Sequence, residues 1–255
     1  EMEIFLGFIF IRFLSGGRSV AEDLAPIREP LSTYRLEEMS PFGPHSITPI
    51  SADWKVAVEN NSEAYHVPIG HPGLQRLYGT TYSLEILGNG TSRGGGQLCK
   101  PSAKSSWSER HYLNLLPRVD HLPEDRQMAW LYYSTFPNVA FEMYPDQIAY
   151  FQILPIAPGR CYARARIYVL EDNRREMRAA RWLNQRINAQ VGREDVGLVE
   201  GTQAGLASLG YGTGHLSRKE ARIKLFQDEI RARIPEALLR QPPENFQPGN
   251  PAEHA

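Results

Sequence analysis

Two histidines and an acidic residue lie close together in the first third of the chain. Glu63, His66 and His71 form the pattern Glu-x-x-His-x-x-x-x-His. Residues three apart share one face of a helix, so Glu63 can reach His66. An unbroken helix would point the two imidazoles about 140° apart. Pro68 and Gly70 break the helix after His66, so the chain can fold back and place both imidazoles beside one metal ion.

Two histidines alone bind a metal weakly, so such a site needs a third ligand. Two histidines and one carboxylate with open positions are the geometry of non-haem Fe(II) oxygenases. The same ligands would suit a zinc hydrolase, although the sequence offers no general base matched to that role. A third interpretation is a module that only carries a hydrophobic ligand and needs no metal, because fold does not fix function.

Two separate motifs resemble the Rieske non-haem iron oxygenase α subunits, the aromatic-ring-hydroxylating oxygenase family. The first motif consists of Trp54-Lys55, Glu59-Asn60, Glu63, His66 and His71-Pro72. The second consists of Glu194-Asp195, Glu200, Gln203 and Gly205-Leu206. Both agree with the family in order and spacing, and the resemblance runs from the first predicted strand to about Ile234.

The resemblance implies a role for each matched residue. His66, His71 and Asp195 would hold one Fe(II) and leave positions open for O₂ and substrate. Glu63 would be the catalytic bridging carboxylate, which in this family links an iron-ligating histidine to a histidine of the neighbouring subunit's Rieske cluster. A carboxylate there also fixes the imidazole tautomer. Without the family, Glu63 would be interpreted as a surface carboxylate and Asp195 as a charge at a helix N-terminus.

The resemblance also implies an activity and partners. The enzyme would be an oxidoreductase that hydroxylates an aromatic substrate or oxidatively demethylates a small organic substrate, by mono- or dioxygenation. Electrons would come from NAD(P)H through a reductase, with or without a ferredoxin, and a [2Fe-2S] Rieske cluster. A homotrimer is the expected assembly.

The two cysteines do not supply a Rieske cluster. Such a cluster needs Cys-x-His and Cys-x-x-His, whereas Cys99 precedes Lys-Pro and Cys161 precedes Tyr-Ala. We therefore interpret residues 1–240 as the mononuclear iron catalytic domain of a longer or multi-chain enzyme, with the Rieske domain outside this chain. The start at Glu1, almost directly in a predicted strand, also suggests a fragment. The Pro-rich residues 241–255 are expected to be a disordered tail.

Composition excludes several classes of protein. The 255 residues carry 28 Lys+Arg and 29 Asp+Glu, a net charge of −1, which gives no support for nucleic acid or an anionic membrane as main partner. With 42% hydrophobic and 22% charged residues, disorder is not expected. Two cysteines cannot form a disulfide framework and favour the cytoplasm. The apolar residues 4–14 are fewer than the roughly 20 that span a bilayer.

The elements that must position the motifs follow from hydrophobic periodicity and turn signals. In the first part of the chain we expect a buried strand over 4–13 and then a helix over 19–25, which has a capping box and closing prolines. Strands over 34–39 and 54–58 should flank a Pro/Gly/Ser-rich connection, and a helix should end near His66. A strand over 82–87 and a mobile loop over 88–104 should follow. Residues 128–170 predict β-structure, and residues 177–209 and 217–234 predict helices.

Together these elements predict an α+β fold. An antiparallel sheet would carry the long C-terminal helices on one face, as in helix-grip (START/Bet v1-like) proteins. Aromatic residues on the expected strands should line a substrate pocket, and Tyr132, Phe141 and Tyr150 are the candidates chosen from the set Tyr132, Tyr133, Phe136, Phe141, Tyr144, Tyr150 and Phe151. Such aromatic side chains can form a wall or a cage for a quaternary ammonium group.

Overall fold

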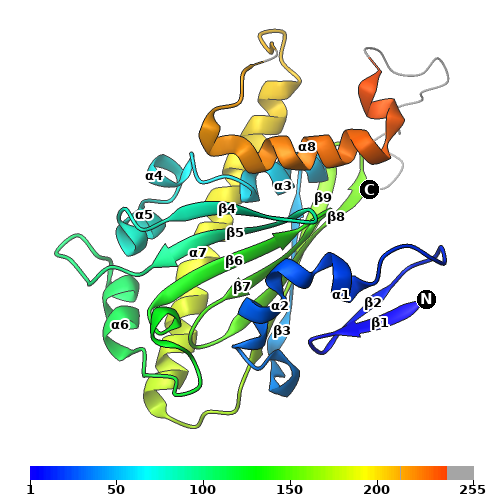
Figure 1. The fold of residues 1–255 in the computed structure, drawn as a ribbon. Coiled ribbons are helices and arrows are strands. Elements are labelled where there is room, and N and C mark those ends of the chain that lie inside the picture. Colours follow the sequence, from blue (N-terminus) through cyan, green and yellow to red (C-terminus); the bar gives the residue numbers. More distant parts are fainter. Residues whose placement is uncertain (213, 240–255) are drawn as a thin grey trace.

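A seven-stranded antiparallel sheet forms the centre of the computed structural model, which describes residues 1–212 and 214–239 (Figure 1). Its strand order is β3-β9-β8-β7-β6-β5-β4. The strands are β3 (Ser40–Ile50), β4 (Ser83–Gly88), β5 (Thr91–Gln97), β6 (Ala129–Thr135), β7 (Val139–Met143), β8 (Ile148–Ala157) and β9 (Arg160–Val169). Consecutive strands from β4 to β9 are neighbours, and β3 closes the far edge by pairing with β9.

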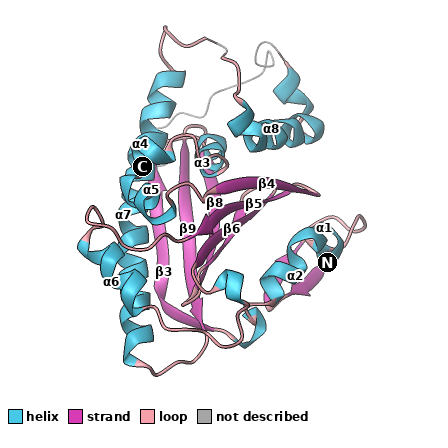
Figure 2. Cartoon of the chain, turned by 60° about the vertical axis from the view of Figure 1, so that its left-hand side comes forward, coloured by secondary structure: helices cyan, strands magenta, loops and turns pink. Residues whose placement is uncertain are grey.

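The helices cover both faces of this sheet. The long helix α7 (Arg175–Leu206) runs across one face, while the hairpin β1–β2 (Met2–Phe5, Phe8–Ile11) and α2 (Ala25–Ser32) lie over the other (Figures 1 and 2). The remaining helices are α1 (Val20–Asp23), α3 (Trp54–Asn61), α4 (Val67–Gly70), α5 (Pro72–Tyr78), α6 (Trp107–Leu115) and α8 (Ala221–Arg233), with 3₁₀ turns at Leu36–Glu38, Glu124–Arg126, Arg218–Glu220 and Pro235–Leu238. The predicted α+β class with an antiparallel sheet is confirmed, and the helix-grip detail stays a prediction.

The two faces of the sheet carry separate cores. On the α7 side, the predicted helical stripe is buried, with Ala180, Leu183 and Ile187 packed against Trp130 and its neighbours. On the other side, the ring of Phe8 lies 5.1–5.5 Å from the rings of Phe141, Tyr150 and Tyr168. These rings seal that face of the sheet. The β-prediction for 128–170 and both capping boxes, at Ser19 and Ser217, are confirmed.

The N-terminal predictions need correction. Residues 4–13 form a hairpin rather than one buried strand, because Leu6 and Gly7 take positive φ angles and turn the chain. The helix that starts after Ser19, α1, ends at Asp23, two residues before its expected end. The prolines expected to close it, Pro26 and Pro30, lie in the next helix, α2, where Pro26 occupies the first turn, a position that tolerates proline.

Four further predictions, between residues 34 and 104, are wrong. The strand predicted over 34–39 is replaced by a 3₁₀ turn at residues 36–38. The strand predicted over 54–58 is replaced by the helix α3, because Asp53 caps that helix by accepting a hydrogen bond from the Lys55 backbone N–H. The Pro/Gly/Ser-rich connection contains β3, an exposed edge strand where prolines are tolerated. The predicted mobile loop contains β5, whose glycines allow close backbone packing: a Cβ at Gly95 would clash with the carbonyl oxygen of Trp130.

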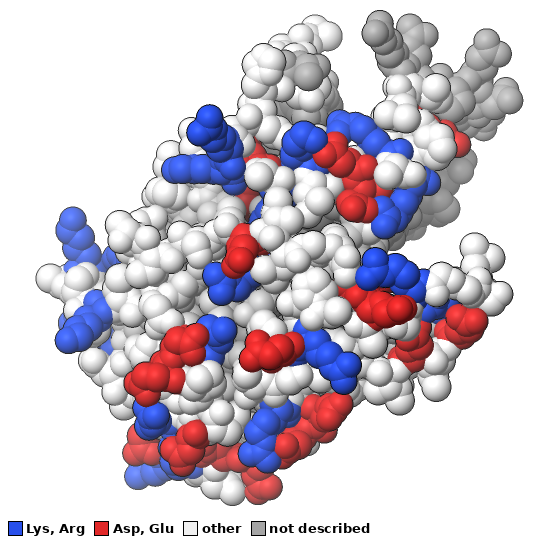
Figure 3. All heavy atoms as spheres, viewed as in Figure 1, with Lys and Arg blue, Asp and Glu red and all other residues white. Residues whose placement is uncertain are grey.

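The described residues include no helix that is long and apolar enough to cross a membrane. On the described part of the face in Figure 3, basic and acidic side chains are interspersed, also along α8. The predicted boundary at residue 240 and the tail 241–255 lie outside the described residues.

A buried polar network ties the sheet to α6 and α7. Asp146, in the turn between β7 and β8, accepts hydrogen bonds from the Tyr112 hydroxyl at 2.7 Å and the Asn184 amide at 3.3 Å. The indole N–H of Trp130 donates to the same Tyr112 hydroxyl at 2.9 Å. The second oxygen of Asp146, Oδ2, has no partner among the described residues. Burial raises the pKa of Asp146 to about 6, against hydrogen bonds that act in the opposite direction.

We expect Gly95→Ala and Gly201→Ala to change stability in opposite directions. At Gly95 the φ of +105° and the clash with Trp130 should lower the free energy of unfolding by about 2–4 kcal/mol. At Gly201, inside α7 with open space for a Cβ, alanine should raise it by about 0.5–1 kcal/mol. Urea unfolding measures both, and a Gly95→Ala protein of wild-type stability would contradict the strand assignment.

Asp146→Asn should remove a pH dependence of stability. The folded-state pKa is raised from 3.8 to about 6, so the folded wild type keeps a proton that the unfolded chain releases. Wild-type stability relative to the variant should therefore fall as pH rises from about 4 to about 6, by at most about 3 kcal/mol. Urea unfolding of both proteins at pH 4, 5, 6 and 7 tests this, and a constant or rising difference would count against it.

Candidate metal centre

The loop between α3 and α5 presents two histidines to α7. The predicted helix that ends at His66 is not formed, because α3 ends at Asn61. His66 instead precedes the short helix α4, and His71 is the residue between α4 and α5. One helical turn therefore brings the two histidines together, with the His71 backbone N–H bonded to Val67 at 3.0 Å. Pro68 lies in the first turn of α4, where proline causes no break.

Close contact between α4 and α7 depends on Gly70. A Cβ at this position would lie 2.7 Å from Cδ1 of Leu198 on α7 and 3.4 Å from Cδ2 of His66. Glycine therefore allows the loop to pack directly on α7, which carries Asp195. Asp195 lies in the second half of this helix and not at its N-terminus, so interaction with the helix dipole does not explain its position.

The structure brings His66, His71 and Asp195 together. Oδ1 of Asp195 lies 2.9 Å from Nε2 of His71 and 3.7 Å from Nε2 of His66, and the two imidazole centroids are 4.9 Å apart. One donor atom of each residue lies within 4.8 Å of the others. The corners of such a triangle lie within about 2.8 Å of a common point, so small movements would give metal bonds of about 2.0–2.2 Å.

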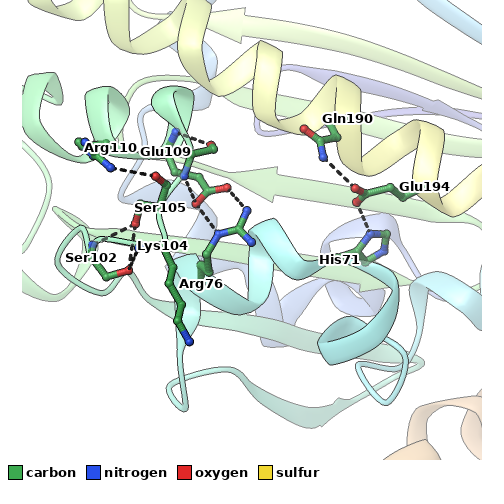
Figure 4. A network of polar contacts seen from close by, with 10 residues as sticks. His71, Arg76, Ser102, Lys104, Ser105, Glu109, Arg110, Gln190 and Glu194 are labelled. Carbon is green, nitrogen blue, oxygen red and sulfur yellow. Dashed lines mark hydrogen bonds and ion pairs between the residues drawn. The ribbon is translucent and has the colours of Figure 1, made fainter.

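Each imidazole also contacts one further carboxylate through Nδ1, the ring nitrogen that does not face Asp195. Glu63 contacts Nδ1 of His66, and Oε2 of Glu194 lies 2.9 Å from Nδ1 of His71. Gln190 in turn donates to Oε1 of Glu194 at 2.9 Å (Figure 4). A carboxylate at Nδ1 favours the tautomer with the proton on that nitrogen and leaves the Nε2 lone pair free. The Nε2 atoms of both imidazoles face Oδ1 of Asp195.

The contact between Glu63 and His66 forms without a shared helix. Both residues lie in the connection between α3 and α4, where Glu63 also accepts from the backbone N–H of His66 at 3.2 Å. The spacing of three residues predicted the contact between Glu63 and His66 correctly, but the shared helix face on which that prediction rested does not exist. A loop turn, and not a helix face, brings the two side chains together.

Glu194 and Asn60 were matched in the sequence motifs but not assigned a role at the site. The Asn60 amide donates to Oδ1 of Asp195 at 2.7 Å and so orients that carboxylate. Glu194 directly precedes Asp195, and this adjacency is the sequence signal for its position beside His71. Figure 4 also shows Arg76 of α5 paired with Glu109 of α6, which fixes the helix that follows His71.

The charge of the cluster suits a divalent cation. Three carboxylates, Glu63, Glu194 and Asp195, surround two imidazoles. Burial alone would lower the pKa of His71, but hydrogen bonds and charge from Asp195 and Glu194 outweigh burial and raise it. The cluster therefore attracts positive charge. Two imidazole nitrogens and one carboxylate oxygen fit the donor set of non-haem Fe(II) sites, and zinc accepts the same donors.

A cavity of about 680 Å³ lies beside these residues, between α7, α3 and the sheet. Asn60 and Asp195 form part of its wall, and apolar side chains form most of the rest. The strands contribute Pro44, Ser46, Thr48, Ile50, Glu142, Ala149, Phe151, Ile153, Ala163, Ala165 and Ile167. A small organic molecule in this cavity would lie next to the candidate metal centre.

The aromatic residues named from the sequence do not line this cavity. Phe141 and Tyr150 point to the opposite face of the sheet, where they pack against Phe8. Tyr132 faces α7, but its hydroxyl accepts from Tyr78 at 2.8 Å within the core. Side chains alternate between faces along a strand, so the pattern alone could not assign the correct face. Tyr144 and Phe151, from the wider set of aromatic residues expected near the pocket, do line the cavity.

Comparison with known proteins gives an independent assignment. The family model described as "Ring hydroxylating alpha subunit (catalytic domain)" matches residues 33–236. Choline monooxygenase of Atriplex hortensis is 25% identical over 217 residues, which cover 81% of this chain and 44% of that protein. The Spinacia oleracea enzyme is 26% identical over 207 residues, covering 78% and 42%. The chain thus spans less than half the length of these relatives.

Solved structures show the same fold. A quaternary ammonium Rieske monooxygenase, described for carnitine oxidation and inter-subunit electron transfer, superposes with a TM-score of 0.70 at 22% identity and covers 91% of this chain and 61% of its own. Naphthalene 1,2-dioxygenase from Rhodococcus sp. gives a TM-score of 0.59 at 14% identity, with coverage of 89% and 64%.

The family model spans most of the chain, including α3, the sheet, both histidines and Asp195. The chain therefore belongs to the ring-hydroxylating oxygenase alpha-subunit family and matches the model of its catalytic domain.

Proposed function

We propose that His66, His71 and Asp195 bind one Fe(II), and that this chain is the oxygen-activating part of a Rieske-type oxygenase. The observation that carries the proposal is the approach of both free imidazole nitrogens to one oxygen of Asp195, at the wall of the cavity. Membership of an oxidoreductase family favours this function over a non-catalytic helix-grip carrier and over a zinc hydrolase.

The residues of this chain prepare the site before any substrate binds. Glu63 and Glu194 keep the protons on Nδ1 of the two imidazoles, and Asn60 holds Asp195 in place. The mostly apolar cavity wall would hold the substrate beside Asp195. Fe(II) bound there would supply the reductive activation of O₂. For monooxygenation the balance is RH + O₂ + two electrons + two protons giving ROH + H₂O.

Electrons must come from outside the residues described here. We propose that they pass from NAD(P)H through a reductase, with or without a ferredoxin, and a [2Fe-2S] Rieske cluster. Glu63 would be their entry point, because its carboxylate touches the imidazole of His66. The description of one structural neighbour in terms of inter-subunit electron transfer supports an assembly in which the cluster belongs to an adjacent subunit, and the proposed assembly is a homotrimer. The cytoplasmic location stays a prediction.

The substrate is proposed to be a small organic molecule. A cavity of about 680 Å³ can hold the small substrate of either reaction, the hydroxylation of an aromatic ring or an oxidative demethylation. Relatives named as monooxygenases of choline and of quaternary ammonium compounds support the second reaction. Neighbours named for naphthalene dioxygenation support the first.

Replacing the proposed ligands should abolish iron binding. After anaerobic reconstitution and desalting we expect one iron per wild-type chain and little iron in His66→Ala, His71→Ala or Asp195→Ala. His45→Ala changes an exposed histidine of β3 and should bind iron like the wild type. Atomic absorption gives the stoichiometry. One tightly bound iron in a protein lacking both His66 and His71 would refute the site, and preferential retention of zinc would support the hydrolase.

Glu194 should strengthen metal binding without touching the metal. Glu194→Ala removes the partner of Nδ1 of His71 and should weaken Fe(II) binding by about 10–100-fold. Glu194→Gln keeps an oxygen that can accept a hydrogen bond from the Nδ1–H group of His71, so this variant should recover a large part of the lost affinity. Competition with a chelator of known affinity measures both variants. Unchanged affinity in Glu194→Ala would contradict the proposed orienting role.

A further inference from the structure

Glu142 is an acidic side chain on the wall of the cavity. It lies on β7, where its cross-strand neighbours are Tyr132 on β6 and Ala149 on β8. Its side chain faces α7 and lines the cavity that also contains Asp195. The hydroxyl of Tyr144 donates to Oε2 of Glu142 at 2.8 Å. Glu142 therefore places a carboxylate in a mostly apolar hollow.

This carboxylate lacks a positively charged partner within the described part of the chain. None of the seventeen ion pairs among the described residues includes Glu142. Arg193 also lines the cavity, but its side chain is exposed and forms no ion pair with Glu142. Burying a carboxylate without a cation destabilises a fold, so its presence indicates a function.

The electrostatics of Glu142 support this view. Burial raises the pKa of its carboxyl group to about 7, and the negative charge of Asp195 acts in the same direction. The Tyr144 hydrogen bond opposes both effects. A cation in the cavity would compensate the charge that the protein leaves unpaired.

Aromatic and small side chains complete the surroundings. Phe151 is the diagonal neighbour of Glu142 on β8, close enough for one small group to touch both. Tyr144 lies on the same wall, and Ala149, beside Glu142, leaves space. A carboxylate combined with aromatic rings and apolar walls suits an ammonium group that carries methyl groups.

We propose that Glu142 determines substrate specificity by binding the ammonium group of a small cationic substrate. This inference rests on the proposed function, because it names the substrate class of the same cavity. The cation would lie against Glu142 and Phe151, with the carbon to be oxidised directed toward His66, His71 and Asp195. The names of the choline and quaternary ammonium monooxygenases agree with this class of substrate.

The test compares choline with 3,3-dimethylbutan-1-ol, an uncharged molecule of nearly the same shape. Calorimetry on the iron-reconstituted chain gives both dissociation constants. We expect the wild type to prefer choline by at least about tenfold. Glu142→Gln should lose that preference through weaker choline binding, while Glu142→Asp, which keeps the charge, should retain part of it. Glu29→Gln, an exposed acid on α2, is the matched control and should behave as the wild type.

Two results would overturn the inference. One is equal affinity of the wild type for the two probes, a comparison that uses the wild-type protein alone and so does not depend on the folding of a variant. The other is an undiminished choline preference in Glu142→Gln. Iron content is measured on every sample, so stoichiometric iron together with either result would reject the ammonium site and leave the proposed function standing. Iron binding that does not need His66 and His71 would instead reject the proposed function.

Discussion

The concentration of negative charge around two imidazoles is the constraint on which the structure depends. Glu63, Glu194 and Asp195 converge on His66 and His71. Without a cation these carboxylates would repel one another. The fold must nevertheless hold them together, with two histidines from one short loop and two acids from the second half of α7. The rest of the chain supplies the rigidity that this arrangement needs.

The sheet provides that rigidity by using its two faces differently. One face is closed by Phe8 and its neighbouring rings, so the strands are firmly packed from behind. The other face binds the first half of α7 through Ala180 and Leu183 and through the Asp146 network. The second half of α7 lies opposite strand residues that include Ala163 and Ala165, and the cavity between them lies beside the proposed metal ligands.

The sequence was sufficient for the features that local pattern controls. The resemblance to a known family, and not local pattern alone, predicted His66, His71 and Asp195 as one site, and the structure brings these residues together although they are far apart in the chain. Alternation identified the strands of 128–170. Local pattern failed where a tertiary contact or a cap decides the structure. Asp53 turns an apparent strand into α3, and backbone packing at Gly95 turns an apparent loop into β5.

The cavity wall illustrates what sequence alone could not provide. Tyr150 and Phe151 are adjacent in sequence and similar in chemistry, yet only the register of β8 decides that Phe151 faces the cavity. Glu142 gave no sequence signal, because an acid within a strand is usually solvent-exposed. Its meaning depends on the cavity in front of it and on the lack of a cation nearby among the described residues. Such environments become visible only when the fold is known.

X-ray absorption spectroscopy of the iron-loaded chain tests the central claim most directly. The account predicts a metal bound by two imidazole nitrogens and by carboxylate and solvent oxygens at about 2.0–2.2 Å. The scattering of two imidazole rings should be visible in the wild type, whereas His71→Ala, which should retain little iron, should lose the signal of the site. A spectrum with oxygen ligands alone, unchanged by that substitution, would contradict the account.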